Sequence, residues 1–382
     1  TTLFRSLRVL YFSRDYAPHD HRFLTALAES EHTVSFLRLE RRGMQREDRP
    51  IPAAVEQIHW YGGDRPARWQ EGLRLVSSLR QVLRRVQPDV VHAGSVQTAA
   101  FLTAAAGFHP LVSMSWRSDL LKDADRSRAW RWATQFTLRR TDVLVGDCQA
   151  VADRAAEFGF PRERMVLFPW GVDLTRFSPG EAPAQRARMG WEDAFVLLSL
   201  RAWEPLYGVD VVVRAFCRAA REVPELRLLL LGGGSQAAEL RRLLEQAGLS
   251  ERVWFGGQVS NTNLAEFYRL ADVYVSAAYS DGSSVSLMEA LACGRPSVVT
   301  DIPSNAEWVQ TGEHGWRFPA GDAEALAAVM VRAAQDRAAL ARMGSAARRL
   351  AEERADWKKN FQKLLAAYDL AVQTQAKRRA ER

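Results

Sequence analysis

Two carboxylates and several small polar residues stand close together in residues 281–289, which read DGSSVSLME after the apolar run VYVSAA. Such a segment is typical of a strand that leads through a turn into a helix. If the helix begins near Ser284, the N–H groups of its first residues, Ser284 to Ser286, lack partners within the helix and can bind an anion, assisted by the helix dipole. Asp281 then precedes the turn and Glu289 lies about two turns into the helix. The two carboxylates suit the hydroxyl groups of a diphosphate-sugar that lies across the helix start.

A purely structural explanation of both carboxylates is the alternative. Asp281 would then act only as an N-cap, and Glu289 would lie only on the helix surface. The stretch SLMEALACG is otherwise apolar, however, and a carboxylate on such a face is hard to explain by packing. We therefore favour the binding interpretation.

A second loop with binding potential follows the apolar run LRLLLL. Three glycines, with Gly233 at the centre, precede the helical segment SQAAEL. Glycine lets backbone N–H groups approach a phosphate or a base closely. Because glycine-rich turns between strands and helices are also common as plain turns, this loop alone indicates little about function.

Both loops belong to an alternation of strands and helices along the chain. Strands are expected at LRVLYFS, HTVSFLRL, PDVVHAGS, PLVSMSW, DVLVGDC and RMVLFPW, and then at FVLLSLR, LRLLLL, RVWFGG, VYVSAA and PSVVTD. Short apolar strands between amphipathic helices indicate parallel sheets covered on both faces, with ligands at the carboxyl ends of the strands. We predict an α/β fold with two Rossmann-like domains, 1–172 and 173–355, followed by a C-terminal helix and a disordered basic tail, 356–382.

The composition fits an ordinary globular protein of two domains. The chain has 382 residues, of which 47% are hydrophobic and 25% charged, and this length exceeds what one core usually supports. The cysteines Cys148, Cys217 and Cys293 form neither a disulfide framework nor a CxxC pattern, which favours a reducing cytosol. No stretch approaches roughly 18 apolar residues and the first residues lack a cleavage site, so we expect neither a membrane span nor a secretion signal.

The net charge of +7 comes mostly from arginines spread along the chain. The densest group is residues 126–140, RSRAWRWATQFTLRR, which on a helix would mix aromatic and basic residues as an interfacial helix does. We favour a solvated helix whose aromatic side chains lie in the core. Contact with an anionic membrane is the alternative.

Residues 271–307 resemble the signature region of the family-4 glycosyltransferases, which are retaining enzymes of the GT-B fold. That family has a carboxylate, seven intervening residues and a glutamate, followed by Ala and by Gly-x-Pro-Val-Val. The matching residues here are Asp281, Glu289, Ala290, Gly294, Pro296, Val298 and Val299. The likeness extends to PDVVH, WGVDLTRFSP, RAWEPLYGVDVVVRAF, LLLLGGG, RVWFGGQV and EHGWRFPAGD. It implies two Rossmann-like domains that face each other across a cleft and a C-terminal helix that crosses back to the first domain.

The resemblance also implies roles in the second domain. Glu289 matches the glutamate that holds the nucleotide ribose, and Asp281 matches a position that contacts hydroxyls of the donor sugar. Arg201, which ends the strand FVLLSLR, matches the arginine on the donor diphosphate, with an ordinary surface arginine as the alternative. The other donor-binding positions are Gly233, Gly282, Ser283, Ser284, Val285, Ser286 and Glu307.

Three positions in the second domain and in the linker before it depart from the family pattern. Asp281 replaces a glutamate and is one methylene shorter. Tyr207 stands where relatives carry a lysine that helps to neutralise the diphosphate, and Trp170 replaces an asparagine of the linker. We keep Tyr207 among the donor-binding residues. Without the lysine, Arg201 or another basic residue has to supply more of the charge stabilisation.

The first domain departs further from the family. Relatives carry a Gly-Gly loop after the first strand, where this chain has YAPHDHRFL, so that Arg22 can supply positive charge and Asp20 can either contact a ligand or cap the helix. Trp116 stands near the usual position of a histidine and can stack on a sugar but cannot act as a base. His92 ends a strand at the same edge, and we favour a structural role for it over a catalytic one. The candidate acceptor or cleft residues are Asp20, His21, Arg22, His92, Trp116, Arg117 and Asp119.

Two sequence patterns could suggest a metal, and we discount both. His19 and His21 form an HxH pair without a third ligand. Asp123 and Asp125 lie in a charged helical stretch, and the enzymes that the chain resembles need no metal. We expect no metal and no cofactor, since the nucleoside-diphosphate sugar is a substrate.

The resemblance implies a retaining, hexosyltransferase-like glycosyltransferase. It would move a sugar from a nucleoside-diphosphate sugar (UDP-sugar first, GDP-sugar second) to a sugar, lipid-linked or small-molecule acceptor, in the synthesis of a glycan, glycolipid or glycoconjugate. We expect a cytoplasmic protein, with peripheral contact to the inner face of an anionic membrane as an option and no nucleic-acid partner. The alternatives are a non-catalytic sugar-nucleotide-binding protein, or a phosphorylase or epimerase of the same fold.

Overall fold

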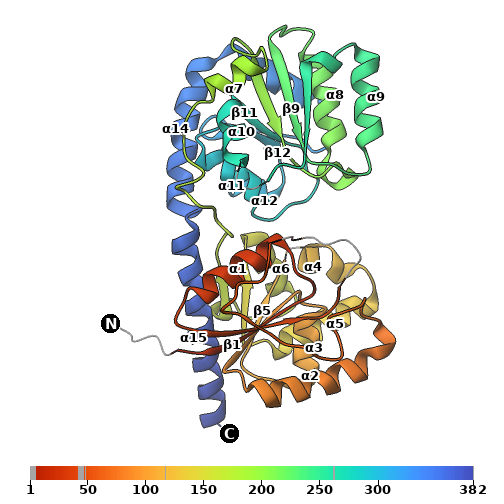
Figure 1. The fold of residues 1–382 in the computed structure, drawn as a ribbon, viewed down its shortest axis with the longest axis vertical. Helices are drawn as coiled ribbons and strands as arrows, with labels where there is room; N and C mark the ends of the chain where they lie inside the picture. The colour runs from red at the N-terminus through yellow and green to blue at the C-terminus, as the bar shows by residue number, and fades with distance from the viewer. Residues whose placement is uncertain (1–5, 42–46, 48, 117, 261–262, 382) are drawn as a thin grey trace. The chain divides into compact units, whose positions relative to one another are not determined.

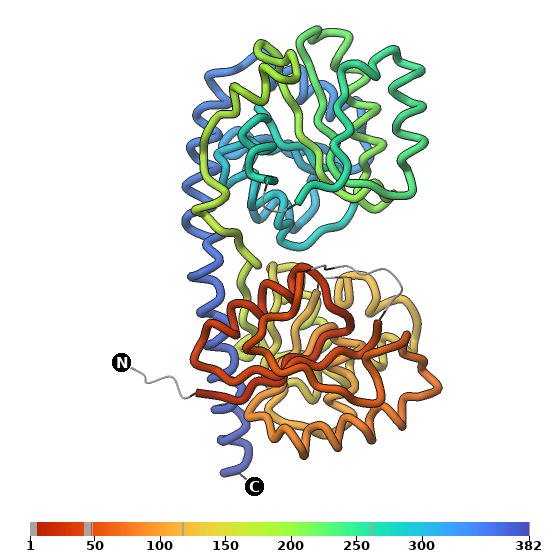
Figure 2. Tube along the Cα trace, viewed as in Figure 1, coloured from red at the N-terminus to blue at the C-terminus, as the bar shows by residue number. Residues whose placement is uncertain are grey.

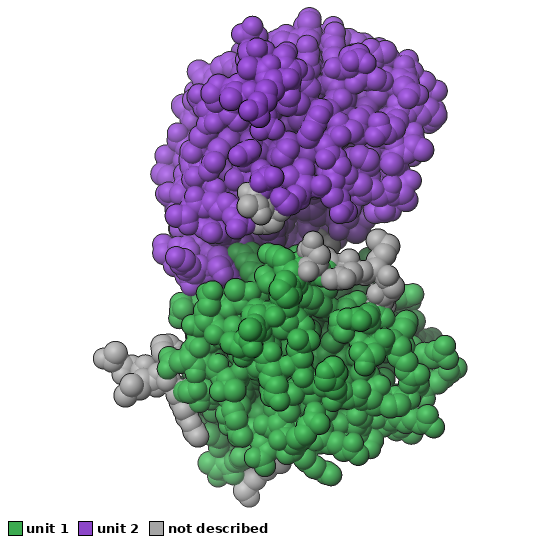
Figure 3. All heavy atoms as spheres, in the orientation of Figure 1, with its two compact units in different colours: residues 1–168, 361–382 green, residues 169–360 purple. Residues whose placement is uncertain are grey.

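A computed structural model describes residues 6–41, 47, 49–116, 118–260 and 263–381 of the chain. The chain forms two compact units, which are coloured separately in Figure 3. Unit 1 consists of Thr1–Phe168 together with Phe361–Arg382, and unit 2 consists of Pro169–Asn360. The chain therefore leaves unit 1 once, builds unit 2 and returns to unit 1 at its C-terminal end (Figure 2).

Unit 1 contains a parallel sheet of seven strands in the order β3-β2-β1-β4-β5-β6-β7. The strands are β1 (Arg8–Ser13), β2 (Thr33–Arg38), β3 (Glu56–Gln57), β4 (Val90–Gly94), β5 (Leu111–Met114), β6 (Val143–Gly146) and β7 (Met165–Leu167). Six of them lie at the predicted runs. Strand β3 was not predicted, because its two residues are polar and exposed.

Helices cover the sheet of unit 1 (Figure 1). They are α1 (Pro18–Ala28), α2 (Gly72–Val86), α3 (Ala99–Ala106), α4 (Ser118–Leu121), α5 (Arg128–Arg140) and α6 (Gln149–Glu157), with short 3-10 turns η1 (Trp69–Glu71), η2 (Asp123–Asp125) and η3 (Arg162–Arg164). Helix α2 illustrates the packing: Leu75, Leu79, Val82 and Leu83 recur at helical spacing, are buried, and join the core formed with α3 and strands β1 and β4.

The last helix, α15 (Trp357–Ala380), packs on unit 1 through a stripe that includes Phe361, Leu364, Tyr368 and Ala371. The predicted disordered tail is wrong for residues up to Ala380, which continue this helix. One reason is that the Arg378 guanidinium lies 2.5 Å from the fully buried Asp142 carboxylate, so the basic end of the helix is held to the unit.

The aromatic residues of α5 are not buried in the core, contrary to the favoured sequence interpretation, although half-buried Phe136 packs against the core of unit 1. The buried face of this helix consists of Ala133, Thr134, Thr137 and Leu138. Trp132 is 57% exposed, and Arg140 packs over the ring of half-buried Phe136 at 3.9 Å. Within the described ranges, none of the helices combines the length and the apolar character needed to span a bilayer.

Unit 2 contains a parallel sheet of six strands in the order β10-β9-β8-β11-β12-β13. The strands are β8 (Phe195–Ser199), β9 (Leu226–Leu231), β10 (Val253–Gly257), β11 (Val273–Ser276), β12 (Ser297–Thr300) and β13 (Gly315–Phe318). The strand order reverses between β8 and β11, and open α/β sheets bind ligands at the carboxyl edge beside such a reversal. The sheet thus directs attention to the loops after β8, β9 and β11.

The helices of unit 2 cover the sheet and complete its core (Figure 1). They are α7 (Pro183–Arg188), α8 (Val209–Ala219), α9 (Ala237–Ala247), α10 (Leu264–Leu270), α11 (Val285–Ala292), α12 (Pro303–Ala306), α13 (Ala323–Gln335) and α14 (Arg337–Arg354), with 3-10 turns η4 (Pro205–Tyr207) and η5 (Ser250–Arg252). The two ends of the unit are tied together, since the Asn360 amide donates to the Pro169 carbonyl at 2.9 Å.

Candidate functional site

The loops after β8 and β9 form one connected platform at the carboxyl edge of unit 2. The Trp203 N–H donates to the Gly233 carbonyl at 2.9 Å, and the Gln236 N–H donates to the Trp203 carbonyl at 3.0 Å. A Cβ atom at Gly234 would lie 2.5 Å from the Trp203 carbonyl oxygen, so the close approach of the two loops requires glycine there. The glycine loop predicted to bind a ligand therefore also has a packing role.

The loop after β11 joins the same platform. The Tyr279 N–H donates to the Leu206 carbonyl at 3.0 Å. Gly208 has a φ of +59°, and a Cβ atom there would lie 2.3 Å from the Ala277 carbonyl oxygen. Only glycine fits this left-handed turn against the neighbouring loop. The three loops thus hold Arg201, Tyr207 and Asp281 at one edge of the sheet.

The structure brings Arg201 and Asp281 into direct contact. The Arg201 guanidinium lies 2.7 Å from the Asp281 carboxylate, and their side chains are only 13% and 6% exposed. The same guanidinium donates to the hydroxyls of Ser284 at 2.7 Å and Ser286 at 3.1 Å. Arg201 is therefore no ordinary surface arginine: it is fixed against the start of α11.

Tyr207, the residue in place of the usual lysine, packs against Arg201. The guanidinium carbon lies 4.5 Å from the centre of the tyrosine ring, within cation–π range. Burial on its own would lower the pKa of Arg201, but Asp281 and the nearby Tyr274 and Tyr207 raise it above its ordinary value. The arginine therefore stays charged, and Tyr207 helps to orient it.

Glu289 is a buried carboxylate and not a helix-surface residue, with an exposed fraction of 4%. It is the fifth residue of α11 and so lies about one turn into the helix, closer to its start than the two turns predicted. The Tyr268 hydroxyl donates to its carboxylate at 2.8 Å. Burial, and then the carboxylate itself, raise the pKa of Tyr268, so this tyrosine keeps the proton that it donates.

Two tyrosines that the sequence interpretation missed complete the polar network of α11. Tyr268 on α10 holds Glu289, and Tyr274 on β11 lies 2.8 Å from the Ser286 hydroxyl. Both tyrosines are fully buried. A buried tyrosine needs a partner for its hydroxyl, so two tyrosines in the apolar segments that precede Asp281 were the available signal.

The remaining predicted donor positions lie at the same edge. Ser283, Ser284 and Ser286 are buried, Ser284 directly precedes α11, and Val285 is 36% exposed at its first turn. The Gly282 N–H donates to the Asp281 carboxylate at 3.0 Å. Glu307 is half-buried directly after α12, which follows the neighbouring strand β12, and Gly233 is half-buried in the glycine loop.

In unit 1, Asp20 is a buried cap of α1. Its carboxylate accepts the Ala17 N–H at 2.9 Å and the Tyr11 hydroxyl at 2.9 Å, and only 1% of the residue is exposed. Burial raises the pKa of Asp20. The structure favours the capping interpretation over contact with an acceptor.

Asp119 is likewise turned inward. Its carboxylate accepts the Val96 N–H at 3.0 Å and the Ser115 hydroxyl at 2.7 Å, and the residue is 2% exposed. Burial raises its pKa. These contacts connect the loops after β4 and β5, so the carboxylate holds two loops together in place of the expected contact with an acceptor.

His92 has the structural role that the sequence favoured, although it was retained among the acceptor residues. Its Nδ1 lies 2.7 Å from the Tyr368 hydroxyl on α15, and its Nε2 lies 3.4 Å from the Met114 sulfur. Only 1% of the residue is exposed, and burial lowers its pKa to about 3. The ring is therefore neutral and fixes α15 to the sheet.

This burial predicts a pH dependence of stability. The pKa of a histidine is about 6.5 in the unfolded chain and about 3 in the folded chain, so the unfolded state binds the extra proton as the pH falls from 6.5. The contribution of neutral His92 to stability is complete above pH 6.5 and is lost toward pH 3. Between pH 7 and pH 5 the loss should be about 2 kcal/mol.

Urea unfolding of the wild type and of His92→Gln at both pH values measures this effect. The wild-type midpoint should fall more steeply between pH 7 and pH 5 than that of His92→Gln, while exposed His59→Gln should behave as the wild type. Equal pH dependence in all three proteins would show that the ring is not held neutral.

The other candidate residues of unit 1 lie around the start of α1. The Tyr16 hydroxyl lies 2.7 Å from His21 Nδ1, Arg22 is half-buried, and Trp116 packs against the His19 ring at 4.2 Å. Arg117 lies outside the described residues. No group of three or more His, Cys, Asp or Glu side chains in the described part of the chain is placed to hold a metal ion.

Comparison with protein families gives two matches that divide the chain. Residues 182–350 match the family described as Glycosyl transferases group 1, and residues 19–176 match Glycosyltransferase Family 4. The first match contains the whole platform of unit 2, and the second contains most of unit 1.

This chain matches part of the length of its curated relatives. A D-inositol 3-phosphate glycosyltransferase of Geodermatophilus obscurus is 30% identical over 283 residues, which is 70% of this chain and 61% of the relative. D-inositol 3-phosphate glycosyltransferase 2 of Catenulispora acidiphila is 38% identical over 199 residues, which is 46% of this chain and 47% of the relative. The chain thus spans less than two thirds of the length of these relatives.

Solved structures share the fold over almost the whole chain. Anabaena Alr3699/HepE in complex with UDP superimposes with a TM-score of 0.79 at 18% identity, covering 95% of this chain and 99% of the other. Sucrose-phosphate synthase of Thermosynechococcus elongatus gives a TM-score of 0.78 at 19% identity, covering 95% and 98%. The solved structures show the GT-B fold. The two family matches, which together cover most of the chain, show that it belongs to family 4 of the glycosyltransferases.

Proposed function

We propose that this protein transfers a sugar from a UDP-sugar to the hydroxyl of an acceptor with retention of anomeric configuration. The observation that carries the proposal is the buried network of Arg201, Asp281 and Glu289 around the start of α11. Solved structures of the same fold are described with UDP and with UDP-glucose, which supports uridine as the base. A GDP-sugar is the second choice.

In this proposal Arg201 neutralises the donor diphosphate. It is fixed at the edge of the platform, and the N–H groups of the first turn of α11, which lack partners within the helix, add positive potential beside it. Asp281 orients the guanidinium through their ion pair, and a carboxylate of this kind accepts hydroxyls of a sugar. Glu289, oriented by Tyr268, accepts the ribose hydroxyls.

The transfer itself needs little more than charge stabilisation. The bond between the anomeric carbon and the phosphate oxygen breaks, and the acceptor oxygen forms the new bond on the same face. The acceptor proton passes to the departing phosphate, whose negative charge Arg201 stabilises. In this scheme neither a metal nor a cofactor takes part, and the nucleotide-sugar is consumed as a substrate.

A donor screen tests the proposal. The melting temperature is measured with UDP-, GDP- and ADP-sugars, each at about 100 times its expected Kd, where binding to the folded state alone adds about 2.7 kcal/mol of stability. UDP-sugars should raise the melting temperature most, and the product formed with any accepted acceptor should keep the donor's anomeric configuration in NMR spectra. A shift with GDP- or ADP-sugars only, or an inverted product, would contradict the proposal.

A further inference from the structure

Unit 1 contains a cavity of about 700 Å³ that the donor chemistry does not use. Helices α2, α3 and α5 and the turn η1 form most of its wall, and the loops after β1, β2 and β4 close one end. This size lies within the range of about 300–1,000 Å³ that is typical of small-molecule sites. The cavity reaches the carboxyl edge of the sheet, beside the reversal of strand order between β1 and β4, where such sheets bind ligands.

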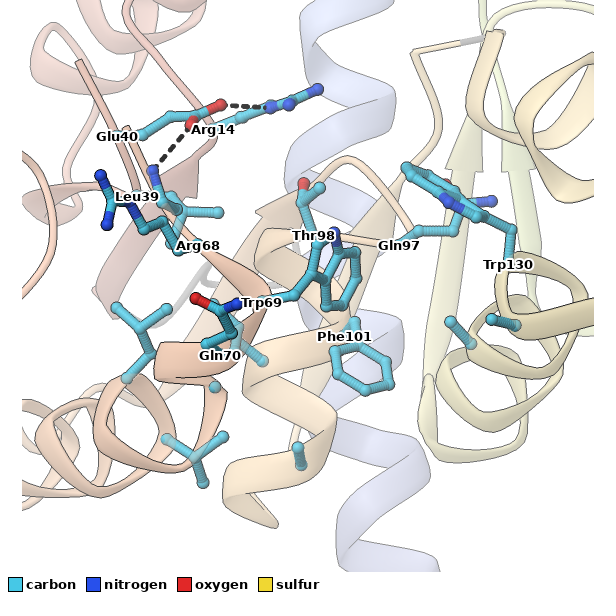
Figure 4. Close-up of a pocket in the computed structure, with 18 of the residues that line it drawn as sticks. Arg14, Leu39, Glu40, Arg68, Trp69, Gln70, Gln97, Thr98, Phe101 and Trp130 are labelled. Atoms are coloured by element: carbon cyan, nitrogen blue, oxygen red, sulfur yellow. Dashed lines mark hydrogen bonds and ion pairs between the residues drawn. The ribbon is translucent and has the colours of Figure 1, made fainter. Parts of the chain in front are cut away.

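The cavity is polar at one end and apolar along its body. The polar end carries Arg14 and Glu40, which form an ion pair at 2.6 Å, and Glu40 also accepts the Ala67 N–H at 2.9 Å (Figure 4). Arg68 is the third charged residue of the lining. The side chains along the body are predominantly apolar and come from α2, α3 and α5: Leu73, Leu75, Val76, Phe101, Leu102, Ala105, Ala129, Trp130, Trp132 and Ala133.

Apolar side chains stand open to solvent at the same cavity. Trp69 is 67% exposed, Leu73 is 89% exposed and Trp132 is 57% exposed. The Trp69 ring contacts Phe101 and Trp130, with centroids 6.4 and 6.2 Å apart. Exposed apolar residues grouped at the lip of an apolar cavity mark a binding surface, whereas isolated ones need no explanation.

Cations accompany this apolar lip. Arg68 lines the cavity and is exposed, and Arg126 packs over the Trp130 ring at 5.5 Å. Arg74 and Arg128 are exposed and adjoin lining residues in the sequence. Tryptophan and leucine beside arginine are the residues that place a protein at an anionic lipid surface.

The inner wall also holds a buried hydrogen-bond acceptor. Gln97 is fully buried and lines the cavity, and its amide nitrogen donates to the Asp119 carbonyl at 2.6 Å and the Thr134 hydroxyl at 2.8 Å. Because the Thr134 hydroxyl proton is already donated to the Trp130 carbonyl, these contacts fix the orientation of the amide. Its oxygen has no hydrogen-bond partner among the described residues.

We propose that this cavity binds the apolar chain of a lipid acceptor, with the polar head group at the Arg14–Glu40 end. The inference rests on the proposed glycosyl transfer, for which the head group supplies the accepting hydroxyl. An apolar channel with the Arg14–Glu40 ion pair at one end matches an amphiphile with one polar end. A peptide would need backbone partners along the body, where the lining side chains are mostly apolar. The cations at the lip fit presentation of the lipid by an anionic membrane.

Alkyl glucosides of increasing chain length, used below their micelle concentrations, test chain binding without turnover. Calorimetric titration should show about fourfold tighter binding per added methylene between hexyl and octyl glucoside, as burial of CH₂ predicts. Ala105→Phe fills the cavity from α3 and should abolish this dependence. Ala129→Phe does so from the exposed side of α5, where it cannot disturb the core, and Ala376→Phe on the exposed face of α15 is the matched control.

Binding of UDP is measured on the same proteins and separates this inference from the proposed function. If UDP binds equally to all variants and chain-length dependence is lost only in Ala105→Phe and Ala129→Phe, the cavity is the chain site. The wild type should also sediment with vesicles that contain phosphatidylglycerol more than with phosphatidylcholine vesicles, and Leu73→Ser should reduce this binding. Chain-length dependence that persists in the filled variants, or its absence from the wild type while UDP binds, would overturn the lipid inference and leave the donor proposal standing.

Discussion

Glu289→Gln should weaken the binding of UDP by tenfold to about 150-fold, because hydrogen bonds to a charged group contribute about 1.5–3 kcal/mol. The substitution keeps the size of the side chain, and the amide oxygen can still accept the Tyr268 hydroxyl that now lies 2.8 Å from the carboxylate. The charge that binds the ribose hydroxyls is lost while the packing of α11 remains. Titration calorimetry with UDP measures the change in Kd.

Two further variants make the Glu289 result interpretable. Glu222→Gln removes a carboxylate from an exposed position of the same unit and should leave the Kd unchanged. Tyr268→Phe retains the carboxylate but removes its orienting hydroxyl, so it should weaken binding less than Glu289→Gln. If Glu289→Gln binds UDP as tightly as the wild type, the buried carboxylate has a structural role only.

Replacement of Arg201 should have the largest effect on turnover. Removing one preorganised donor to a developing negative charge typically lowers kcat by about 10²–10³-fold, and Arg201 is the cation that the structure fixes beside the start of α11. Arg201→Lys keeps the positive charge but loses the planar guanidinium that binds Asp281, Ser284 and Ser286 together. This variant should therefore retain only part of the wild-type activity. Steady-state kinetics with the accepted donor measure kcat for each variant.

Stability has to be separated from catalysis in this experiment. Arg201→Met alone leaves the Asp281 carboxylate buried without its partner, and breaking such a pair typically costs about 3–5 kcal/mol. Adding Asp281→Asn removes the uncompensated charge and should raise the melting temperature again, while kcat stays low. Recovery of kcat together with the melting temperature would mean that Arg201 supports the fold and does not stabilise the leaving group.

The sequence predicted five of the six strands of unit 2, and the turn that opens α11, because these signals are local. Apolar runs mark β8 to β12, and the order of residues 281–289 marks the start of α11. The partners of these residues come from elsewhere in the chain. Tyr268 and Tyr274 reach α11 only through the packing of α10 and β11, and Tyr207 approaches Arg201 only because Gly208 permits a tight turn.

The candidate residues of unit 1 could not be sorted in the same way. Asp20, Asp119 and His92 are polar residues at strand ends or helix starts, which is also where binding residues occur. Their burial of 98–99% became visible only with the contacts to Tyr11, Val96 and Tyr368. The cavity was not predictable either, since Trp69, Phe101 and Trp130 belong to three elements that are separated along the chain.

Hydrogen exchange with and without UDP tests most directly whether the donor site lies at the platform of unit 2. The amides of residues 199–208, 231–236 and 279–289 should exchange more slowly with bound UDP, because these loops carry the contacts of Arg201, the glycine turn and the start of α11. The same experiment with Glu289→Gln at equal UDP concentration should show little protection. UDP binding that protects other segments and leaves these three loops unchanged would contradict the assignment.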